Sequence, residues 1–218
     1  MRVAERDYVP AAPQLWLYDA LVVVLARAPR WRRALLDQLA PREGDVIADV
    51  GCGTGTQLVK IGRAAPGVTL IGIDPDPDVL ARARHKLAAA RVVAGLTRGY
   101  ARDAEVLLRD RAVNKAISSL VFHQVPLEEK EAGLAAIRAA LVPGGELHVA
   151  DYGLQRTPLM RKLFRVVQAG DGYANTEPNA KGVLPELMAK VGFSRVSETA
   201  VITTPTGSVS LYRAECGR

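Results

Sequence analysis

Ten residues, VIADVGCGTG at 46–55, contain the strongest structural signal in the chain. Four of the first five are apolar, as expected of a short buried strand, and a helix is expected over 54–64. The alternating glycines Gly51, Gly53 and Gly55 let the backbone bend sharply between the two elements, and let a ligand approach where a Cβ would collide. In an open α/β sheet such a strand-to-helix junction lies at the carboxyl ends of the strands, where ligands bind.

Strand and helix signals alternate along the rest of the chain. Strands are expected at 45–50, 68–73, 96–100, 115–119, 146–150, 194–203 and 208–214, and helices at 13–40, 54–64, 78–90, 127–141 and 184–191. This alternation requires parallel strands joined by crossover helices, so the chain is predicted to be an α/β protein. Pro143-Gly144-Gly145 is expected to stop the fourth of these helices. Only a short turn with Pro205 and Gly207 separates the last two strands, so the final strand must run antiparallel.

An acidic residue beside the glycine turn restricts the ligand. A dinucleotide-binding turn has two residues before its third glycine and presents a helix N-terminus to a pyrophosphate. Here only Thr54 separates the second and third glycines, and Asp49 stands two residues before the first. A carboxylate at that place repels a pyrophosphate but can bind an ammonium, directly or through water. S-adenosylmethionine has an ammonium and no phosphate, so the pattern favours this methyl donor over a nicotinamide dinucleotide.

Asp74 ends the second expected strand, nineteen residues after Gly55. A carboxylate there can accept both hydroxyls of a ribose, the use that acids have in dinucleotide folds. The alternative is that Asp74 only caps the loop before Asp76 and Pro77, which have the composition of a helix start. The position directly after the strand favours ribose binding.

Several stretches resemble the class I S-adenosylmethionine-dependent methyltransferases, particularly the branch of ubiquinone and menaquinone biosynthesis. They are residues 46–55, LIGID at 70–74, ISSLVFHQVP at 117–126, LVPGGEL at 141–147 and AKVGF at 189–193. The resemblance implies a Rossmann-like, doubly wound sheet of seven strands in the order 3-2-1-4-5-7-6, with strand 7 antiparallel. An N-terminal helical cap over 1–40 would precede a single catalytic unit over 41–218.

The same resemblance implies the residues that bind the methyl donor. Asp49 and the glycine backbone would meet the methionine part, Asp74 the ribose, and two serines after strand four the region of the sulfonium. The full set expected at the donor is Asp49, Gly51, Cys52, Gly53, Thr54, Gly55, Asp74, Pro75, Asp103, Ala104, Ser118, Ser119 and Tyr18.

Two members of this set have alternatives. The family commonly has an acid after strand three that meets the adenine amino group. Asp103 is favoured for this role, but Tyr100 takes the position if Gly99-Tyr100-Ala101 is the true match. Tyr18 lies in an apolar N-terminal segment that either covers the donor, with Tyr18 reaching its carboxylate, or packs as an ordinary helix.

His123 and Asp151 are the candidate catalytic residues. Methyl transfer from a sulfonium depends mainly on alignment, which can supply about 7–11 kcal/mol of barrier reduction. A base helps only if the accepting atom bears a proton, and a histidine a few residues after strand four has a suitable pKa for that. His123 can instead pack at the start of the next helix, and Asp151 can either contact the acceptor or shape the loop after strand five. The stretch 152–180 is expected to form part of a lid.

The amino-acid composition indicates the general class of protein and limits the partners that are expected. The chain is 49% hydrophobic and 24% charged, as in globular proteins, and its net charge of +6 is spread along the sequence. Its longest mainly apolar run, residues 20–28, has nine residues with Arg27 among them, whereas a membrane span needs about twenty. No export signal is seen, and two cysteines, Cys52 and Cys216, indicate neither a disulfide framework nor a metal cage, so a cytoplasmic location is predicted.

The acceptor is predicted to be a small, partly apolar molecule methylated at an O, N, C or S atom. The chain lacks the Asn/Asp-Pro-Pro-aromatic sequence with which base-amino methyltransferases hold a flipped base, so no nucleic-acid partner is expected. No motif specifies the accepting atom or an oligomeric state. The alternatives are an S-adenosylmethionine-binding protein without transferase activity and a nicotinamide-dependent oxidoreductase.

Overall fold

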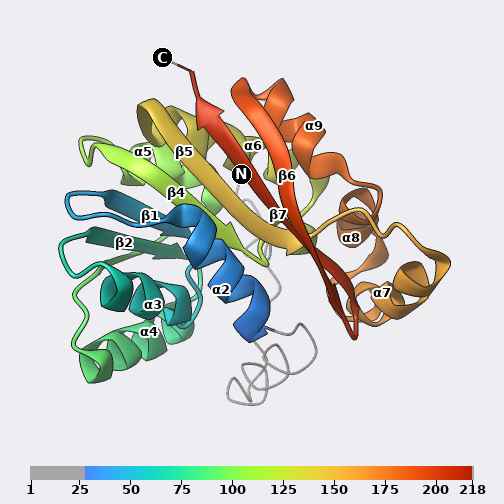
Figure 1. Cartoon of the computed structure of the whole chain (residues 1–218), viewed down its shortest axis with the longest axis horizontal. Coiled ribbons are helices and arrows are strands. Elements are labelled where there is room, and N and C mark those ends of the chain that lie inside the picture. The colour runs from blue at the N-terminus through green and yellow to red at the C-terminus, as the bar shows by residue number, and fades with distance from the viewer. Residues whose placement is uncertain (1–27, 218) are drawn as a thin grey trace, which may run out of the picture.

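Seven strands form one sheet in the order β3-β2-β1-β4-β5-β7-β6. A computed structural model describes residues 28–217, and Figure 1 shows how they are arranged. β7 pairs antiparallel with both β5 and β6, whereas the other neighbouring strands are parallel. The predicted strand order and the antiparallel seventh strand are therefore confirmed.

The elements have the following bounds. The strands are β1 (Val46–Val50), β2 (Thr69–Asp74), β3 (Gly95–Arg98), β4 (Val113–Ser119), β5 (Leu141–Tyr152), β6 (Phe193–Thr204) and β7 (Gly207–Cys216). The α-helices are α2 (Ala28–Leu39), α3 (Thr56–Ala64), α4 (Pro77–Ala90), α5 (Ala104–Leu107), α6 (Leu127–Ala140), α7 (Pro158–Asp171), α8 (Tyr173–Ala180) and α9 (Val183–Lys190). Two single-turn helices are η1 (Ala101–Asp103) and η2 (Phe122–Gln124).

Helices cover both faces of the sheet, and successive residues of β1 show why. Ile47 is buried in a cluster with Leu58 of α3 and Leu80 of α4, whereas Ala48 is buried in a second cluster with Leu134 of α6. Neighbouring side chains of a strand point to opposite faces, so a strand that is apolar throughout needs a cover on each side. In Figure 1, α2, α3 and α4 lie in front of the sheet, and α5 and α6 lie behind it.

α2 is the described part of the predicted N-terminal helical region. Trp31 is fully buried in a third cluster with Tyr152 of β5 and Leu211 of β7. Gln38 at the other end of α2 donates to the carbonyl oxygen of Tyr212 at 3.0 Å. The helix therefore packs on the sheet as one of its covering layers. The remainder of the predicted cap, with Tyr18, lies outside the described residues.

The stretch 152–180 contains two helices, α7 and α8, that were not predicted from the sequence. α7 begins with Thr157, whose side chain accepts from the backbone N–H of Met160 at 3.1 Å, and Pro158 occupies its first position. Phe164 is buried, and its ring lies 5.1 Å from that of Tyr152. Figure 1 shows this helix pair at the right-hand end of the molecule, beyond the carboxyl end of β5.

β5 begins earlier than predicted. α6 ends at Ala140, and Leu141 already pairs with Val113 of β4. The pairing with β4 is then interrupted and resumes at Glu146, and between them Gly144 has a φ of +78°. The Pro-Gly-Gly sequence is thus a break inside a strand and not the signal that ends the helix.

Candidate active site

The glycine turn joins β1 to α3 and is folded over the end of β2. The backbone N–H groups of Gly51 and Cys52 both donate to the carbonyl oxygen of Ile73, at 2.8 and 2.9 Å. Gly51, Gly53 and Gly55 have φ values of +78°, +54° and +75°. L side chains rarely adopt such values, so the turn needs all three glycines.

The three glycines differ in what surrounds them. A Cβ at Gly51 would lie 2.1 Å from Cγ2 of Val121, and one at Gly55 would lie 3.2 Å from Cβ of Ala83. A Cβ at Gly53 would meet no atom within 4 Å. Gly51 and Gly55 therefore allow close packing of the protein on itself, whereas Gly53 faces open space that a ligand can enter.

Asp49 lies at the end of β1 with no exposed surface, and neither carboxylate oxygen has a hydrogen-bond partner among residues 28–217. Burial, and after it the charge of Asp74, raise the pKa of Asp49 to about 7, although Arg32 opposes the shift. Buried polar groups in proteins are nearly always paired, so an unpaired carboxylate needs an explanation. A cationic ligand group beside the turn would supply the missing partner.

Asp74 lies at the end of β2 and supports the turn. One carboxylate oxygen accepts from the backbone N–H of Gly53 at 2.9 Å, and the other accepts from that of Asp76 at 3.0 Å. Burial raises the pKa of Asp74, although these two hydrogen bonds oppose the shift. Each oxygen keeps one further lone pair for a ligand hydroxyl. Asp74 therefore caps the loop, as the alternative stated, and retains the capacity to bind a ribose.

The other predicted residues of the turn have structural partners. The hydroxyl of Thr54 accepts from Nζ of Lys86 at 2.6 Å, which ties the turn to α4. Cys52 is buried, and burial raises the pKa of its thiol, so the thiol is not a nucleophile. The carbonyl oxygen of Pro75 accepts from Nε of Arg98 at 3.1 Å, which links the loop after β2 to the end of β3.

The segment after β3 brings Tyr100 and Asp103 together. A carboxylate oxygen of Asp103 accepts from the backbone N–H of Tyr100 at 2.9 Å, and the backbone N–H of Asp103 donates to the carbonyl oxygen of Tyr100 at 3.0 Å. The segment is adjacent to Asp74, whose carbonyl oxygen accepts from the N–H of Gly99 at 3.2 Å. Ala104 follows and is fully buried. Both candidates for the adenine contact thus lie in one turn beside the ribose candidate.

Ser118 and Ser119 end β4, next to β1. Ser118 is fully buried, and its hydroxyl has no hydrogen-bond partner in the described part of the chain, whereas Ser119 is partly exposed. The register pairs Asp49 with Ile117, one residue before Ser118. The unpaired polar atoms of Asp49 and Ser118 therefore lie at the same edge of the sheet.

His123 is held between two carboxylates. Its Nδ1 lies 2.6 Å from a carboxylate oxygen of Asp151, and its Nε2 lies 3.3 Å from one of Asp171 at the end of α7. Burial alone lowers the pKa of His123, but the two carboxylates outweigh burial and raise it to about 9. The imidazole is thus cationic at neutral pH, with both ring nitrogens occupied.

Asp151 anchors the segment that follows β4. It is fully buried, and one oxygen accepts from the backbone N–H groups of Val121 and Phe122, at 3.1 and 2.7 Å. The other oxygen faces His123 and accepts from the N–H of Tyr152 at 2.7 Å. The structure therefore places the two candidate catalytic residues in one buried ion pair, and the catalytic role itself stays a prediction.

Three further polar residues were not singled out as functional from the sequence. Lys86 contacts the turn, Asp171 contacts His123, and Lys130 is a fully buried lysine on α6. Lys130 stands in a glutamate-rich stretch of α6, a pattern that normally indicates a helix face exposed to solvent. Only Asp171 stands beside a local sequence signal, because it is followed by Gly172, a residue typical of helix ends.

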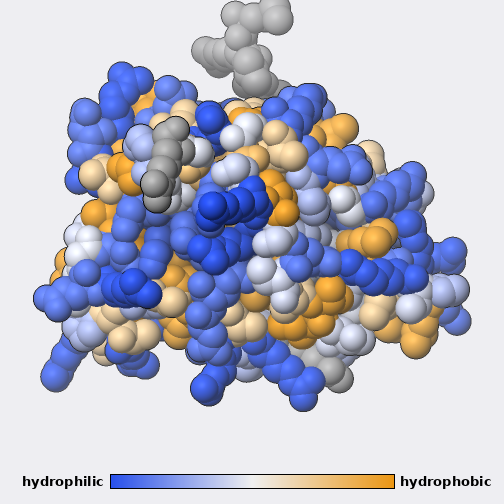
Figure 2. Space-filling model, turned by 45° about the horizontal axis from the view of Figure 1, so that its top comes forward, coloured by the Kyte–Doolittle hydropathy of each residue, from blue (hydrophilic) through white to orange (hydrophobic). Residues whose placement is uncertain are grey.

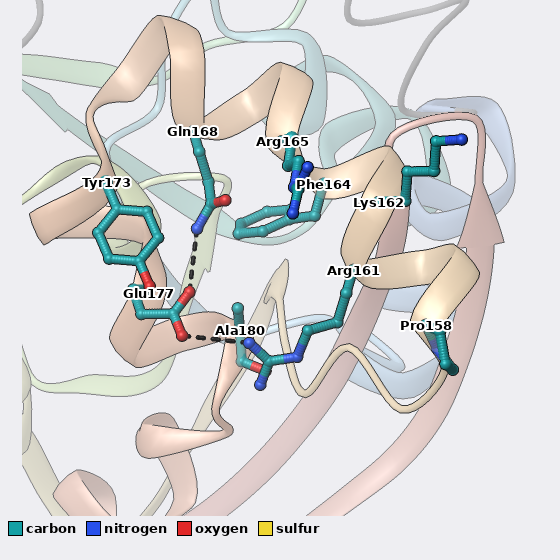
Figure 3. Close-up of a pocket in the computed structure, with 9 residues that line it drawn as sticks. All are labelled: Pro158, Arg161, Lys162, Phe164, Arg165, Gln168, Tyr173, Glu177 and Ala180. Carbon is teal, nitrogen blue, oxygen red and sulfur yellow. Dashed lines mark hydrogen bonds and ion pairs between the residues drawn. The ribbon is translucent and has the colours of Figure 1, made fainter.

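A pocket of about 390 Å³ lies between α7 and α8. In Figure 3, Arg161 and Gln168 of α7 both point to Glu177 of α8, and the distances are 3.1 and 3.0 Å. The lining combines rings, cations and one carboxylate: Pro158, Arg161, Lys162, Phe164, Arg165, Gln168, Tyr173, Glu177 and Ala180. The carboxylate is thus already neutralised, and the pocket has an excess of positive charge.

Three other properties of the described residues bear on partners. On the face seen in Figure 2, hydrophilic residues predominate and hydrophobic residues lie in small separate groups. Over residues 28–217, no helix is long and apolar enough to cross a membrane. In the same range, no group of three or more His, Cys, Asp or Glu side chains is placed to hold a metal ion.

Comparison with known proteins agrees with this geometry. Residues 47–145 match a family model described as a methyltransferase domain. The carboxy-S-adenosyl-L-methionine synthase of Trichodesmium erythraeum is 30% identical over 164 residues, covering 72% of this chain and 62% of that protein. The demethylmenaquinone methyltransferase of Deinococcus radiodurans is 26% identical over 204 residues, covering 90% of this chain and 82% of that protein. A solved O-methyltransferase family protein from Burkholderia thailandensis has a TM-score of 0.73 at 16% identity, covering 92% of this chain and 58% of that one.

The strand order and the glycine turn define the class I methyltransferase fold. With the match over residues 47–145, they identify an S-adenosylmethionine-dependent methyltransferase domain in the chain. The chain spans 41%, 62% and 53% of the length of three of the curated relatives that it matches.

Proposed function

We propose that the chain transfers a methyl group from S-adenosylmethionine to a small-molecule acceptor. The observation that carries the proposal is Asp49, a fully buried carboxylate without a hydrogen-bond partner within the described residues, beside a turn whose central glycine faces open space. The ammonium of the donor fits this carboxylate, because a charge-assisted hydrogen bond would satisfy both groups. A pyrophosphate would instead bring negative charge to Asp49 and Asp74, which disfavours a nicotinamide dinucleotide.

The remaining donor contacts follow from the same edge of the sheet. Asp74 is proposed to accept the ribose hydroxyls with its free lone pairs, and the backbone at Gly53 to lie against the methionine part. Asp103 is proposed to meet the adenine amino group, with Tyr100 as the alternative, and the unpaired hydroxyl of Ser118 to lie near the sulfonium. When bound, the donor supplies an electrophilic methyl group on a positively charged sulfur; the chain binds and orients it.

His123 and Asp151 are proposed to position the active site. A histidine whose two nitrogens both face carboxylates, and whose pKa is raised to about 9, does not have a free lone pair at neutral pH. Asp151 fixes the backbone of Val121 and Phe122, which follow β4. Alignment of donor and acceptor is the main requirement of this reaction, so a rigid loop at this place serves it.

The acceptor is proposed to be a small molecule that enters from the side of α7 and α8. The pocket between these helices, at about 390 Å³, has the size of a small-molecule site. Its buried wall, Phe164, contacts Tyr152 at the carboxyl end of β5, and Tyr152 contacts His123 with ring centroids 4.9 Å apart. No nucleic-acid partner is proposed.

Residues 41–218 are proposed to form the catalytic unit, with the N-terminal cap over 1–40 adding to it. Of this cap, α2 covers one face of the sheet through the buried Trp31. The cytoplasmic location predicted from the sequence stays a proposal; Cys52 and Cys216 are both free thiols.

Calorimetric titration with S-adenosylmethionine, S-adenosylhomocysteine and NAD⁺ tests the donor. We expect binding of the first two ligands and none of NAD⁺. Asp74→Ala is expected to weaken binding of S-adenosylmethionine by about 1.5–3 kcal/mol, the scale of hydrogen bonds to charged groups. Binding of NAD⁺ alone would overturn the proposal, and unchanged affinity in folded Asp74→Ala would remove Asp74 from the site.

Release of S-adenosylhomocysteine in the presence of phenols, quinols, amines and thiols tests the transfer. Turnover with any of these acceptors supports the proposed activity. Donor binding with no turnover across the panel would favour the alternative of a binding protein without transferase activity.

A further inference from the structure

The buried ammonium of Lys130 joins two parts of the chain that are far apart in sequence. Its Nζ donates to the carbonyl oxygens of Phe122, of Val125 at 2.6 Å and of Asn175 at 2.8 Å. The first two carbonyls belong to the segment after β4, and the third belongs to α8. An ammonium has three N–H donors, so all of them are used.

Two more polar contacts cross the same boundary. The side-chain amide of Asn175 donates to the carbonyl oxygen of Gln124 at 2.9 Å, and Nε2 of His123 lies 3.3 Å from Asp171. We call residues 121–125 the β4 loop and residues 158–180 the lid. The lid is therefore tied to the β4 loop by Lys130, Asn175 and Asp171.

The β4 loop in turn packs against the glycine turn. Asp151 accepts from the backbone N–H of Val121 at 3.1 Å. The side chain of Val121 packs so closely on Gly51 that a Cβ added there would be only 2.1 Å from its Cγ2. A displaced β4 loop would thus alter the wall of the donor site. The lid and the donor site share this one loop.

The carboxylates of this network are compensated only while its two bases are protonated. Lys130 and His123 face Asp151 and Asp171, and Glu128 adds a further negative charge near Lys130. Burial alone lowers the pKa of His123, but the carboxylates raise it to about 9; burial lowers the pKa of Lys130 to about 8. Loss of the proton on His123 leaves Asp151 and Asp171 without the cation that contacts them, and loss of the proton on Lys130 makes the network more negative.

We propose that Lys130 and Asp171 are positioning residues of this enzyme: by tying the lid to the β4 loop they hold Val121 against the glycine turn and so set the affinity for the methyl donor. The inference rests on the proposed function for the identity of the donor. The link between lid and β4 loop does not depend on that identity.

Calorimetry with S-adenosylmethionine and amide hydrogen exchange on the full chain test the proposal. Lys130→Met and Asp171→Asn are expected to lower donor affinity by at least about fivefold, a usual scale for coupling between sites. Both variants are also expected to speed amide exchange over 121–125. The control is Lys181→Met, which removes an exposed lysine directly after the lid and outside the pocket lining, and is expected to leave affinity and exchange within twofold of the unmodified chain.

The pH profile of donor affinity separates positioning from a general structural role. In the unmodified chain the affinity should rise as Asp49 ionises near pH 7 and fall again between about pH 8 and 9, where Lys130 and His123 lose their protons. Asp171→Asn removes one of the carboxylates that raise the pKa of His123. The alkaline fall should therefore move to lower pH while the acidic rise stays in place.

The proposal would be overturned if Asp171→Asn left donor affinity, amide exchange over 121–125 and the alkaline fall in affinity all unchanged. If Lys130→Met does not fold, the result for Asp171→Asn is sufficient to test the proposal. If the unmodified chain does not bind S-adenosylmethionine, the proposed function fails. Exchange over 121–125 then still decides whether the lid holds the β4 loop: faster exchange in the variants supports the link, and unchanged exchange refutes it.

Discussion

Asp49 is fully buried and has no hydrogen-bond partner among the residues that the structure describes, so its charge is expected to lower stability and to favour donor binding. Its folded-state pKa of about 7 lies above that of an unfolded aspartate, about 3.9. The folded state therefore holds more protons than the unfolded state between these two pH values. The contribution of this group to stability is complete below about pH 4 and is lost as the pH rises through 7.

Asp49→Asn is expected to raise the thermal stability of the ligand-free protein at pH 8 and to weaken the binding of S-adenosylmethionine. The first effect follows because the variant removes an unpaired buried charge. The second is expected to be about 1.5–3 kcal/mol, since a charge-assisted hydrogen bond is lost. Thermal melts and calorimetry measure the two quantities. A loss of both stability and affinity would show that Asp49 has a partner within the protein and is not reserved for a ligand.

Binding of the donor at pH 6 should release a proton. Asp49 is mostly protonated at that pH, and an ammonium beside it favours the ionised form. The observed binding enthalpy should then depend on the ionisation enthalpy of the buffer at pH 6, and much less so at pH 8.5. A buffer-independent enthalpy at pH 6 would contradict contact between the ammonium and Asp49.

At the residue scale, the sequence predicted where the acids lie but not what surrounds them. Asp49 and Asp74 lie at the ends of neighbouring parallel strands, as expected from the apolar residues before them, and their roles toward the donor stay predictions. The burial of Lys130 could not be predicted, because its three acceptors are backbone carbonyls that only the folded chain brings together. For the same reason, the second carboxylate on His123 was not foreseen.

At the scale of elements, Gly51 and Gly144 have the same backbone conformation in different surroundings and can be compared. Both have a φ of +78°, but a Cβ at Gly144 would meet nothing within 4 Å, whereas one at Gly51 would overlap Val121. Gly144→Ala is expected to cost about 1–2 kcal/mol, the strain of a left-handed conformation. Gly51→Ala is expected to cost a further 1–3 kcal/mol or so from overpacking, and to weaken donor binding.

Chemical denaturation and calorimetry of the two glycine variants check this expectation. The informative comparison is the difference between the variants, because their backbone strain is the same. Equal losses of stability, with donor affinity retained in Gly51→Ala, would mean that Val121 can move aside without disturbing the site.

Helices and strands with a regular spacing of apolar residues or a clear start signal were predicted well, and those that depend on tertiary contacts were not. α4 begins where Asp76 and Pro77 predicted, and the Asp76 side chain accepts from the N–H of Asp78 at 2.9 Å. α7 was not predicted, although Thr157-Pro158 is a helix start, because only Phe164 on it is fully buried and the apolar stripe is thin. The early start of β5 depends on pairing with Val113, which local sequence does not encode.

For the whole molecule, His123 predicts the pH dependence of stability above neutrality. Its folded-state pKa of about 9 exceeds the value of about 6.5 for an unfolded histidine, so its contribution is complete below about pH 6.5 and is lost as the pH rises through 9. Lys130 acts in the opposite direction, because its lowered pKa makes the folded state gain stability from about pH 8 upward. Between pH 7 and 8 the His123 effect should dominate.

We therefore expect the melting temperature of the ligand-free protein to fall from pH 7 to pH 8. In His123→Gln, the protein should be less stable at pH 7 and the slope over this interval should largely disappear. Differential scanning calorimetry at pH 7 and pH 8 on both proteins measures these melting temperatures. An unchanged slope in the folded variant would show that His123 is not the group that titrates.

The contact between Gly51 and Val121 also constrains how this enzyme can diverge. The two positions are seventy residues apart in the chain, yet one can gain volume only after the other has lost it. Substitutions must then accumulate in one order, with position 121 shrinking first, and even so only residues that tolerate a left-handed backbone can follow at 51. Among descendants of this sequence, a larger residue at 51 should occur only together with a smaller one at 121.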